Sequence, residues 1–262
     1  MTAGSDRHPE ANEAVELHSS QAGLFATRYD TLESDPYSSC FHYSRKRLHA
    51  MIDRLLPSEG NGRRLLDVGC GTGHQMAAMR GRGYAVAGVD GSEAMLEHAR
   101  RLNPGGELRQ GEVGALPFGT AEFDIVLCLE VLRYLPSIRP CVGEMARVLK
   151  PGGTCLATAS PLFNLSGFPL VNRLAGVLPF GDFVRLRQYF HASPGLGRAF
   201  RAAGFADVTT RGVYMGLVNW VERLSPSLLP RVLPVWERLD PAVSDRFLLR
   251  DLSGMLLVHA VR

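Results

Sequence analysis

The chain has 262 residues, of which 45% are hydrophobic and 21% charged, an ordinary composition for one large globular domain. Its 29 basic and 26 acidic residues give a net charge of +3, which is too small to indicate a nucleic-acid partner. Five cysteines lack the spacing of metal ligands, and no apolar stretch reaches the roughly 18–20 residues that span a bilayer. A polar start without an apolar signal segment favours a cytoplasmic location.

The first 39 residues differ in character from the rest. Residues 1–20 are polar, and we expect them to be mobile. An aromatic segment with Phe25, Tyr29 and Tyr37 follows. From Phe41 to Leu56 apolar residues recur at helical spacing, which predicts a helix. We therefore divide the chain into a mobile segment, 1–39, and a domain, 40–262.

Residues 64–73 carry the strongest local signal. An apolar run ends at Gly69, Gly71 and Gly73, and a helix-forming stretch follows, which predicts a buried strand, a tight turn and a helix. A dinucleotide fingerprint would need a small residue where His74 stands, and the lysine of a phosphate-binding loop is missing. An acid two residues before the first glycine, Asp67, suits a ligand with an ammonium group.

The following segments alternate between strand and helix. Strands are predicted at 84–89, 107–111, 123–129 and 154–159, with helices at 93–102 and 144–149 between them. Asp90 ends the second strand, where a carboxylate can bind both ribose hydroxyls, and Ser92 is placed as a helix N-cap. This alternation predicts a doubly wound, mostly parallel α/β sheet. Two further strands are expected at 206–214 and 255–261.

Four of these motifs, in this order, resemble those of class I S-adenosylmethionine-dependent methyltransferases of the small-molecule type. They are the glycine turn, the run from Asp90 to Met95, the fourth strand, and Lys-Pro-Gly-Gly at 150–153 before the fifth strand. The resemblance implies a seven-stranded Rossmann-like sheet with an antiparallel last strand, and an aromatic N-terminal segment that covers the cofactor. It implies S-adenosylmethionine as cofactor and S-adenosylhomocysteine as product. Glu112 stands where the family commonly has Asp for adenine. The implied cofactor-binding residues are Asp67, Gly69, Cys70, Gly71, Gly73, Asp90, Gly91, Met95, Glu112, Val113 and Leu129.

Two apolar insertions, at about 160–192 and 216–250, interrupt the later pattern. Because both leave the sheet near the glycine turn, we expect them to form an apolar acceptor pocket that includes Phe163, Phe168 and Trp220. The alternatives are that the insertions form an ordinary cap with a small core of its own and solvated arginines, and that the pocket lies under the aromatic stretch 25–43. The acceptor is expected to be lipophilic or aromatic. An anionic group on it would be met by Arg133, Arg173, Arg185 or Arg187. A peripheral membrane contact stays open.

The sequence therefore predicts an enzyme that methylates a small molecule, with oxygen as the first choice of acceptor atom because it is common in such proteins. Candidates for the general base and its helpers are His191, His42, Tyr29 and Tyr134. N- or C-methylation is the nearest alternative, followed by a non-catalytic cofactor-binding protein. A nicotinamide-dependent oxidoreductase is disfavoured by His74. We expect no metal, and the oligomeric state stays open.

Overall fold

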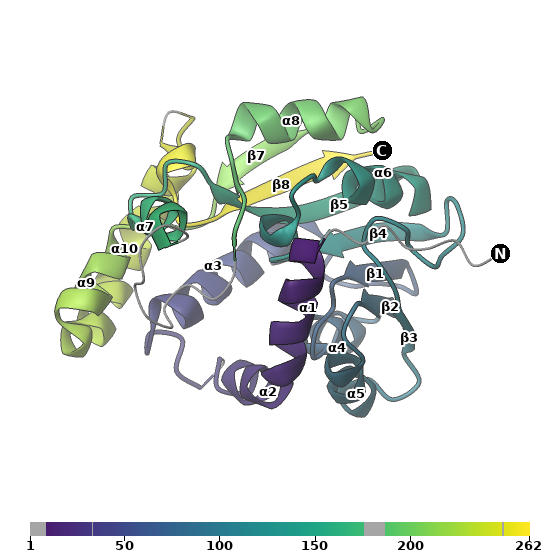
Figure 1. Cartoon of the computed structure of the whole chain (residues 1–262), viewed down its shortest axis with the longest axis horizontal. Helices are drawn as coiled ribbons and strands as arrows, with labels where there is room; N and C mark the ends of the chain where they lie inside the picture. Colours follow the sequence, from purple (N-terminus) through teal and green to yellow (C-terminus); the bar gives the residue numbers. More distant parts are fainter. Residues whose placement is uncertain (1–8, 33, 176–186, 248) are drawn as a thin grey trace.

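The computed structural model describes residues 9–32, 34–175, 187–247 and 249–262 (Figure 1). Its centre is one sheet with the strand order β3-β2-β1-β4-β5-β8-β7, and the short β6 pairs with β5 outside this path. The strands are β1 (Arg64–Val68), β2 (Ala85–Asp90), β3 (Glu107–Gln110), β4 (Phe123–Cys128), β5 (Leu149–Pro161), β6 (Phe190–His191), β7 (Thr209–Gly212) and β8 (Leu256–Val261).

The sheet confirms the predicted doubly wound architecture. Strands β3, β2, β1, β4 and β5 run parallel, and β8 is antiparallel to both β5 and β7. The chain order reverses between β1 and β4, so the carboxyl ends of these two strands border a crevice of the kind in which open α/β sheets bind ligands.

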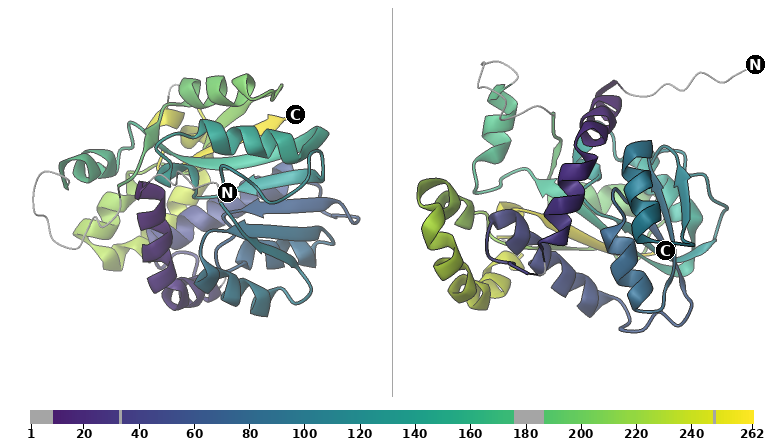
Figure 2. Two further views of the ribbon diagram at one scale, coloured as in Figure 1. Left: turned by 45° about the vertical axis from the view of Figure 1, so that its right-hand side comes forward. Right: turned by 90° about the horizontal axis from the view of Figure 1, so that it is seen from below.

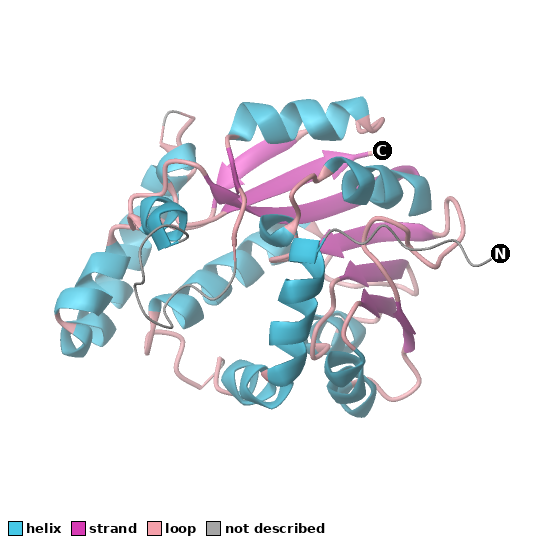
Figure 3. Ribbon diagram, in the orientation of Figure 1, coloured by secondary structure: helices cyan, strands magenta, loops and turns pink. Residues whose placement is uncertain are grey.

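Helices cover both faces of the sheet (Figure 3). One buried cluster joins the sheet to α6 and α8, and the other joins it to α3, α4, α5, α9 and α10. Burial of both faces explains why a central strand such as β4 is almost wholly apolar. The helices are α1 (Pro9–Ser20), α2 (Ala22–Asp30), α3 (Cys40–Leu55), α4 (His74–Gly81), α5 (Glu93–Leu102), α6 (Arg139–Val148), α7 (Phe168–Ala175), α8 (Ser193–Ala202), α9 (Val218–Leu224) and α10 (Leu229–Ser244).

Local signals placed several boundaries well. Ser92 caps α5, and its hydroxyl oxygen accepts a hydrogen bond from the amide of Met95 at 3.2 Å. Helix α6 instead begins five residues before the predicted 144, because Pro140 is well suited to the first helical turn. Strand β7 is shorter than the predicted 206–214.

The N-terminal segment departs from the expectation. From residue 9 it forms α1 and α2 rather than a mobile chain, and both helices contact α5. Ala14 is buried, and the hydroxyls of Ser19 and Ser92 lie 2.7 Å apart. The hydrophobic pattern of α1 is weak because few apolar side chains suffice for this contact. Figure 2 shows α1 and α2 beside the carboxyl ends of the parallel strands.

A buried polar contact joins α3 to α10. The hydroxyl of Tyr43 donates to a carboxylate oxygen of Asp240 at 2.6 Å, and Arg47 lies 3.8 Å from the same oxygen. Asp240 also accepts a hydrogen bond from the amide of Met215. Because Tyr43 and Asp240 are fully buried, this contact fixes how the two helices pack.

Candidate active site

The glycine turn lies at the carboxyl end of β1. Gly69, Gly71 and Gly73 all have positive φ, at 73°, 52° and 81°. A Cβ on Gly71 would meet nothing within 4 Å, so this residue faces open space. A Cβ on Gly73 would lie 2.6 Å from Asn103 Nδ2, so Gly73 instead allows α4 to pack on the segment after α5.

Two acids flank this turn. Asp90 accepts hydrogen bonds from the amides of Gly71 at 2.8 Å and Ser92 at 2.9 Å, which fixes the turn against the end of β2. Burial raises the pKa of Asp90, although these amides oppose the shift. Burial and the charge of Asp90 raise the pKa of the Asp67 carboxyl to about 7. A cationic group bound between these acids would stabilise both carboxylates.

A cavity of about 1450 Å³ opens over the turn. It exceeds the roughly 300–1,000 Å³ of a typical small-molecule pocket, so it has room for more than one ligand. Most of the residues predicted from the sequence line it: Tyr29, Asp67, Gly69, Cys70, Gly71, Asp90, Gly91, Met95, Glu112, Val113, Leu129 and Tyr134. Gly73, His42 and His191 do not.

The two histidines proposed as bases are therefore misplaced. His42 lies on the outer side of α3, where its ring is 2.5 Å from Ser38 Oγ and 3.0 Å from Ser39 Oγ. His191 belongs to β6, which pairs with the end of β5, and burial lowers the pKa of its imidazole. Both histidines have aromatic neighbours in the sequence, but such neighbours do not determine whether the imidazole ring faces the cavity.

The sequence analysis overlooked another histidine, which does line the cavity. His18 of α1 contacts the rings of Phe25 and Tyr134, with centroids 5.2 and 5.1 Å away. Its Nδ1 lies 2.7 Å from the carbonyl oxygen of Ala14, and burial lowers the pKa of its imidazole. The polar composition of residues 1–20 gives no sign of the helix that brings His18 to the cavity. His74, used before only against a dinucleotide site, stacks on Tyr29 with centroids 5.2 Å apart.

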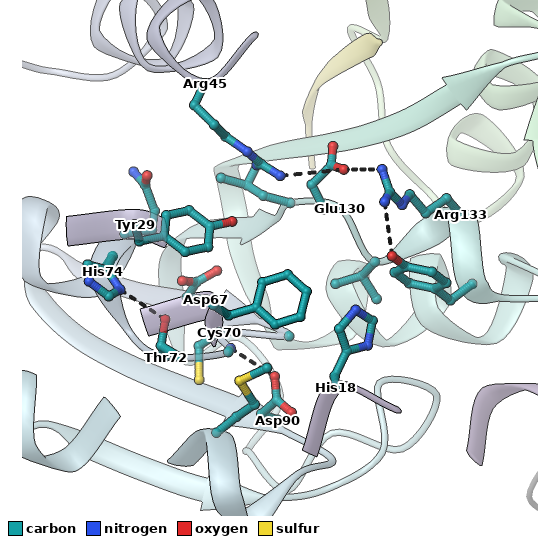
Figure 4. Close-up of a pocket in the computed structure, with 18 of the residues that line it drawn as sticks. His18, Tyr29, Arg45, Asp67, Cys70, Thr72, His74, Asp90, Glu130 and Arg133 are labelled. Carbon is teal, nitrogen blue, oxygen red and sulfur yellow. Dashed lines mark hydrogen bonds and ion pairs between the residues drawn. The ribbon is translucent and has the colours of Figure 1, made fainter. Parts of the chain in front are cut away.

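The carboxyl end of β4 carries a charged row that Figure 4 shows along one side of the cavity. Glu130 has a positive φ of 63°, a strained conformation for a residue other than glycine. Its carboxylate pairs with Arg133, and Arg45 of α3 lies 3.5 Å away. Burial alone would raise the pKa of Glu130, but the charges of Arg133 and Arg45 hold it below its usual value.

The two insertions expected to form the acceptor pocket contribute little to the described lining of this cavity. No described residue of 160–192 lines the cavity, and 216–250 contributes only Asn219 and Glu222 to its described lining. Trp220 donates from its indole nitrogen to the carbonyl of Leu165 at 2.8 Å, so the insertions bind each other. The cavity instead lies under Phe25, Tyr29 and Phe41, the alternative considered.

Other chemistries find little support. Burial raises the pKa of the Cys70 thiol well above its usual value, which makes a nucleophilic thiolate unfavourable. Across the described parts of the chain, no group of three His, Cys, Asp or Glu residues could hold a metal ion. Within the described ranges, no helix is long and apolar enough to cross a membrane. Of the arginines expected to meet an anion, Arg133 lines the cavity, Arg187 lies over Tyr189, and Arg173 and Arg185 fall outside the described side chains.

Comparison with known proteins gives one consistent result. The "Methyltransferase domain" family matches residues 66–157. Demethylmenaquinone methyltransferase of Clavibacter sepedonicus is 33% identical over 186 residues, which cover 63% of this chain and 75% of that protein. Malonyl-[acyl-carrier protein] O-methyltransferase of Erwinia pyrifoliae is 32% identical over 138 residues, 45% of this chain and 53% of that protein. The chain thus spans about half the length of the Erwinia protein.

A solved S-adenosylmethionine-dependent methyltransferase from Thermotoga maritima shares the fold, with a TM-score of 0.61 at 19% identity over 91% of this chain and 96% of that one. The fold and the site define a class I, Rossmann-like methyltransferase. The chain belongs to the S-adenosylmethionine-dependent methyltransferases, and S-adenosylmethionine is the cofactor of this family.

The residues at the turn fit this cofactor. Open space over Gly71 leaves room for its amino-acid part, and the buried Asp67 matches its ammonium group. Asp90 lies at the end of β2, beside Gly91 and Met95, where the ribose is expected. When bound, the cofactor supplies an electrophilic methyl group, and the protein has to orient an acceptor toward it and exclude water.

Proposed function

We propose that the protein transfers this methyl group to an oxygen of a small, lipophilic or aromatic acceptor. The observation that carries the proposal is a single cavity with two unlike halves. Asp67, Gly71 and Asp90 provide a polar cofactor half, and aromatic rings from α2 and α3, together with Arg45, Glu130 and Arg133, line the other half. Apolar walls with a few polar groups are typical of small-molecule sites.

Within this proposal, His18 replaces His42 and His191 as the candidate base. Its depressed pKa favours the neutral imidazole at pH 7, the form that can accept a proton from an acceptor hydroxyl. If Nδ1 donates to Ala14, Nε2 is the atom that accepts. Tyr134, whose ring contacts that of His18, and Tyr29 would position the acceptor.

The charges in the cavity bear on the acceptor atom. Arg45 and Arg133 lie together beside Glu130, and these three side chains leave one positive charge in excess. An oxyanion of the acceptor would be attracted to this part of the cavity, whereas an ammonium group would be repelled. The Erwinia relative is named an O-methyltransferase, and a relative from Desulfotalea psychrophila is named a ubiquinone/menaquinone biosynthesis C-methyltransferase, so C-methylation of a quinol ring is the second candidate.

The test is methyl transfer from labelled cofactor to a panel of hydroquinones, simple phenols and aryl amines, with products identified by mass spectrometry and NMR. We expect O-methyl products from the phenolic members. His18→Gln should lower the rate of transfer while leaving S-adenosylhomocysteine affinity within about threefold. Exclusive methylation at ring carbon or at nitrogen would contradict the proposed acceptor atom, and an unchanged rate in His18→Gln would contradict the base.

A further inference from the structure

The side chain of Arg45 is unusual for a buried guanidinium. It is only 8% exposed, and its one ion-pair partner among the described residues is Glu130, at 3.5 Å. Its Nε is buried and makes no hydrogen bond within the described structure. The rings of Phe41 and Tyr29 lie 5.2 and 5.7 Å from its guanidinium carbon. Such a donor is costly to bury without an acceptor, so its position needs an explanation.

Hydrogen-bond donors exceed acceptors in this part of the cavity. Two guanidinium groups offer about ten N–H donors between them. Arg133 donates to Glu130 and to the hydroxyl of Tyr134 at 3.0 Å, and its buried Nε makes no hydrogen bond within the described structure. One carboxylate cannot satisfy two guanidiniums, so the site has room for a further acceptor of negative charge.

We propose that Arg45 and Arg133 form a subsite for an oxyanion of the acceptor, either a carboxylate or the ionised oxygen of an acidic hydroxyl. This inference rests on the proposed function. Glu130 holds the two guanidiniums side by side in the free protein, and an incoming anion takes up the excess positive charge. Figure 4 shows the arginines on one side of the cavity and Asp90 with Thr72 on the other, so cationic and anionic ligand groups would separate.

The same chemistry could come from a second source, because the amino-acid end of the cofactor also carries a carboxylate. The surroundings of Arg133 favour the acceptor. Its guanidinium donates to the hydroxyl of Tyr134 at 3.0 Å, and the ring of Tyr134 contacts that of His18, the candidate base. The experiment below separates the two sources.

The probes are 1-naphthoate and its neutral amide, 1-naphthamide, titrated by calorimetry into the protein saturated with S-adenosylhomocysteine. We expect naphthoate to bind at least about tenfold more tightly than naphthamide, the value of one charge-assisted contact. Arg45→Gln should remove that preference, and Arg133→Gln should reduce it. Arg198→Gln, on the exposed side of α8, is the matched control and should preserve it.

Glu130→Gln distinguishes a binding subsite from a purely structural ion pair. Removing its negative charge should strengthen naphthoate binding by about threefold or more, because the arginines lose their internal competitor. A structural pair would instead give weaker naphthoate binding, and the melting temperature is expected to fall in either case because both guanidiniums lose a buried partner. If Arg45→Gln fails to fold, Arg45→Lys, Arg133→Gln and Glu130→Gln still decide the matter.

For the cofactor arm, S-adenosylhomocysteine and its decarboxylated analogue are titrated into the wild type and Arg45→Gln. If Arg45→Gln binds both ligands with affinities reduced equally, by about threefold or less relative to the wild type, the result supports the acceptor subsite. A loss of about tenfold confined to S-adenosylhomocysteine assigns Arg45 to the cofactor carboxylate and overturns the proposal. Naphthoate binding that is undetectable, or no tighter than that of the amide, also overturns it. Methyl transfer by a variant without naphthoate preference would leave the proposed function standing.

Discussion

Substitution of Gly71 tests the cofactor site directly, because the effect of backbone strain can be separated from the effect of filling the space beside the residue. Its φ of 52° is unfavourable for any residue with a Cβ, yet an added methyl would touch no atom of the protein within 4 Å. Gly71→Ala should therefore cost about 1–2 kcal/mol of stability from backbone strain alone. For a domain of this size that lowers Tm by roughly 2–8 °C. The methyl group would enter the space expected for the cofactor.

Gly62→Ala is the matched control, since Gly62 has a φ of 72°, meets nothing within 4 Å and lies outside the cavity. Both variants should lose similar stability, measured by thermal unfolding. Only Gly71→Ala should weaken S-adenosylhomocysteine binding in calorimetry, by at least about tenfold. If Gly71→Ala and Gly62→Ala bind S-adenosylhomocysteine with affinities within threefold of each other, the placement of the cofactor over this turn is refuted.

Three further perturbations test other parts of the site. Asp90→Ala should weaken S-adenosylhomocysteine binding by about 1.5–3 kcal/mol, the value of a hydrogen bond to a charged group, and normal affinity would contradict the ribose assignment. The pKa of Asp67 is raised to about 7 in the free protein, and a bound ammonium group lowers it. Binding should therefore release protons near pH 6–7, and affinity should fall by up to about tenfold per pH unit as the pH drops below 7. Calorimetry in buffers of different ionisation enthalpy measures this, and a pH-independent affinity would count against it. Phe25→Ala should impair methyl transfer by about tenfold, whereas Trp220→Ala should lower Tm and leave transfer unchanged, and the reverse pattern would restore the insertion pocket.

The sequence was most informative where backbone conformation is dictated locally. Alternating glycines after an apolar run, an acid at the end of β2, and a serine before α5 have few other interpretations. The structure has all three where they were expected. The parallel order of the sheet followed from the alternation of strand and helix, since parallel neighbours require long connections.

The acceptor side was harder to predict because its residues come from elements far apart in the chain. His18, Arg45 and Glu130 belong to α1, α3 and the end of β4, and no spacing relates them. The described insertion residues contribute little to the cavity for a related reason. Their apolar residues say nothing about what they will contact: Trp220 lies beside Gly167, donates its indole N–H to the carbonyl of Leu165 and stays 44% exposed.

The buried contact between Tyr43 and Asp240 has a consequence for the order of folding. Its partners are separated by 197 residues, so α3 emerges from the ribosome long before α10 exists. At synthesis rates of about 5–20 residues per second, the delay is roughly 10–40 s. During that interval the Tyr43 hydroxyl and Arg47 have no Asp240 to contact. The apolar residues of α3 also lack the α10 residues that belong to the same buried cluster. Helix α10 therefore completes the packing of α3, the helix that carries Arg45 into the cavity.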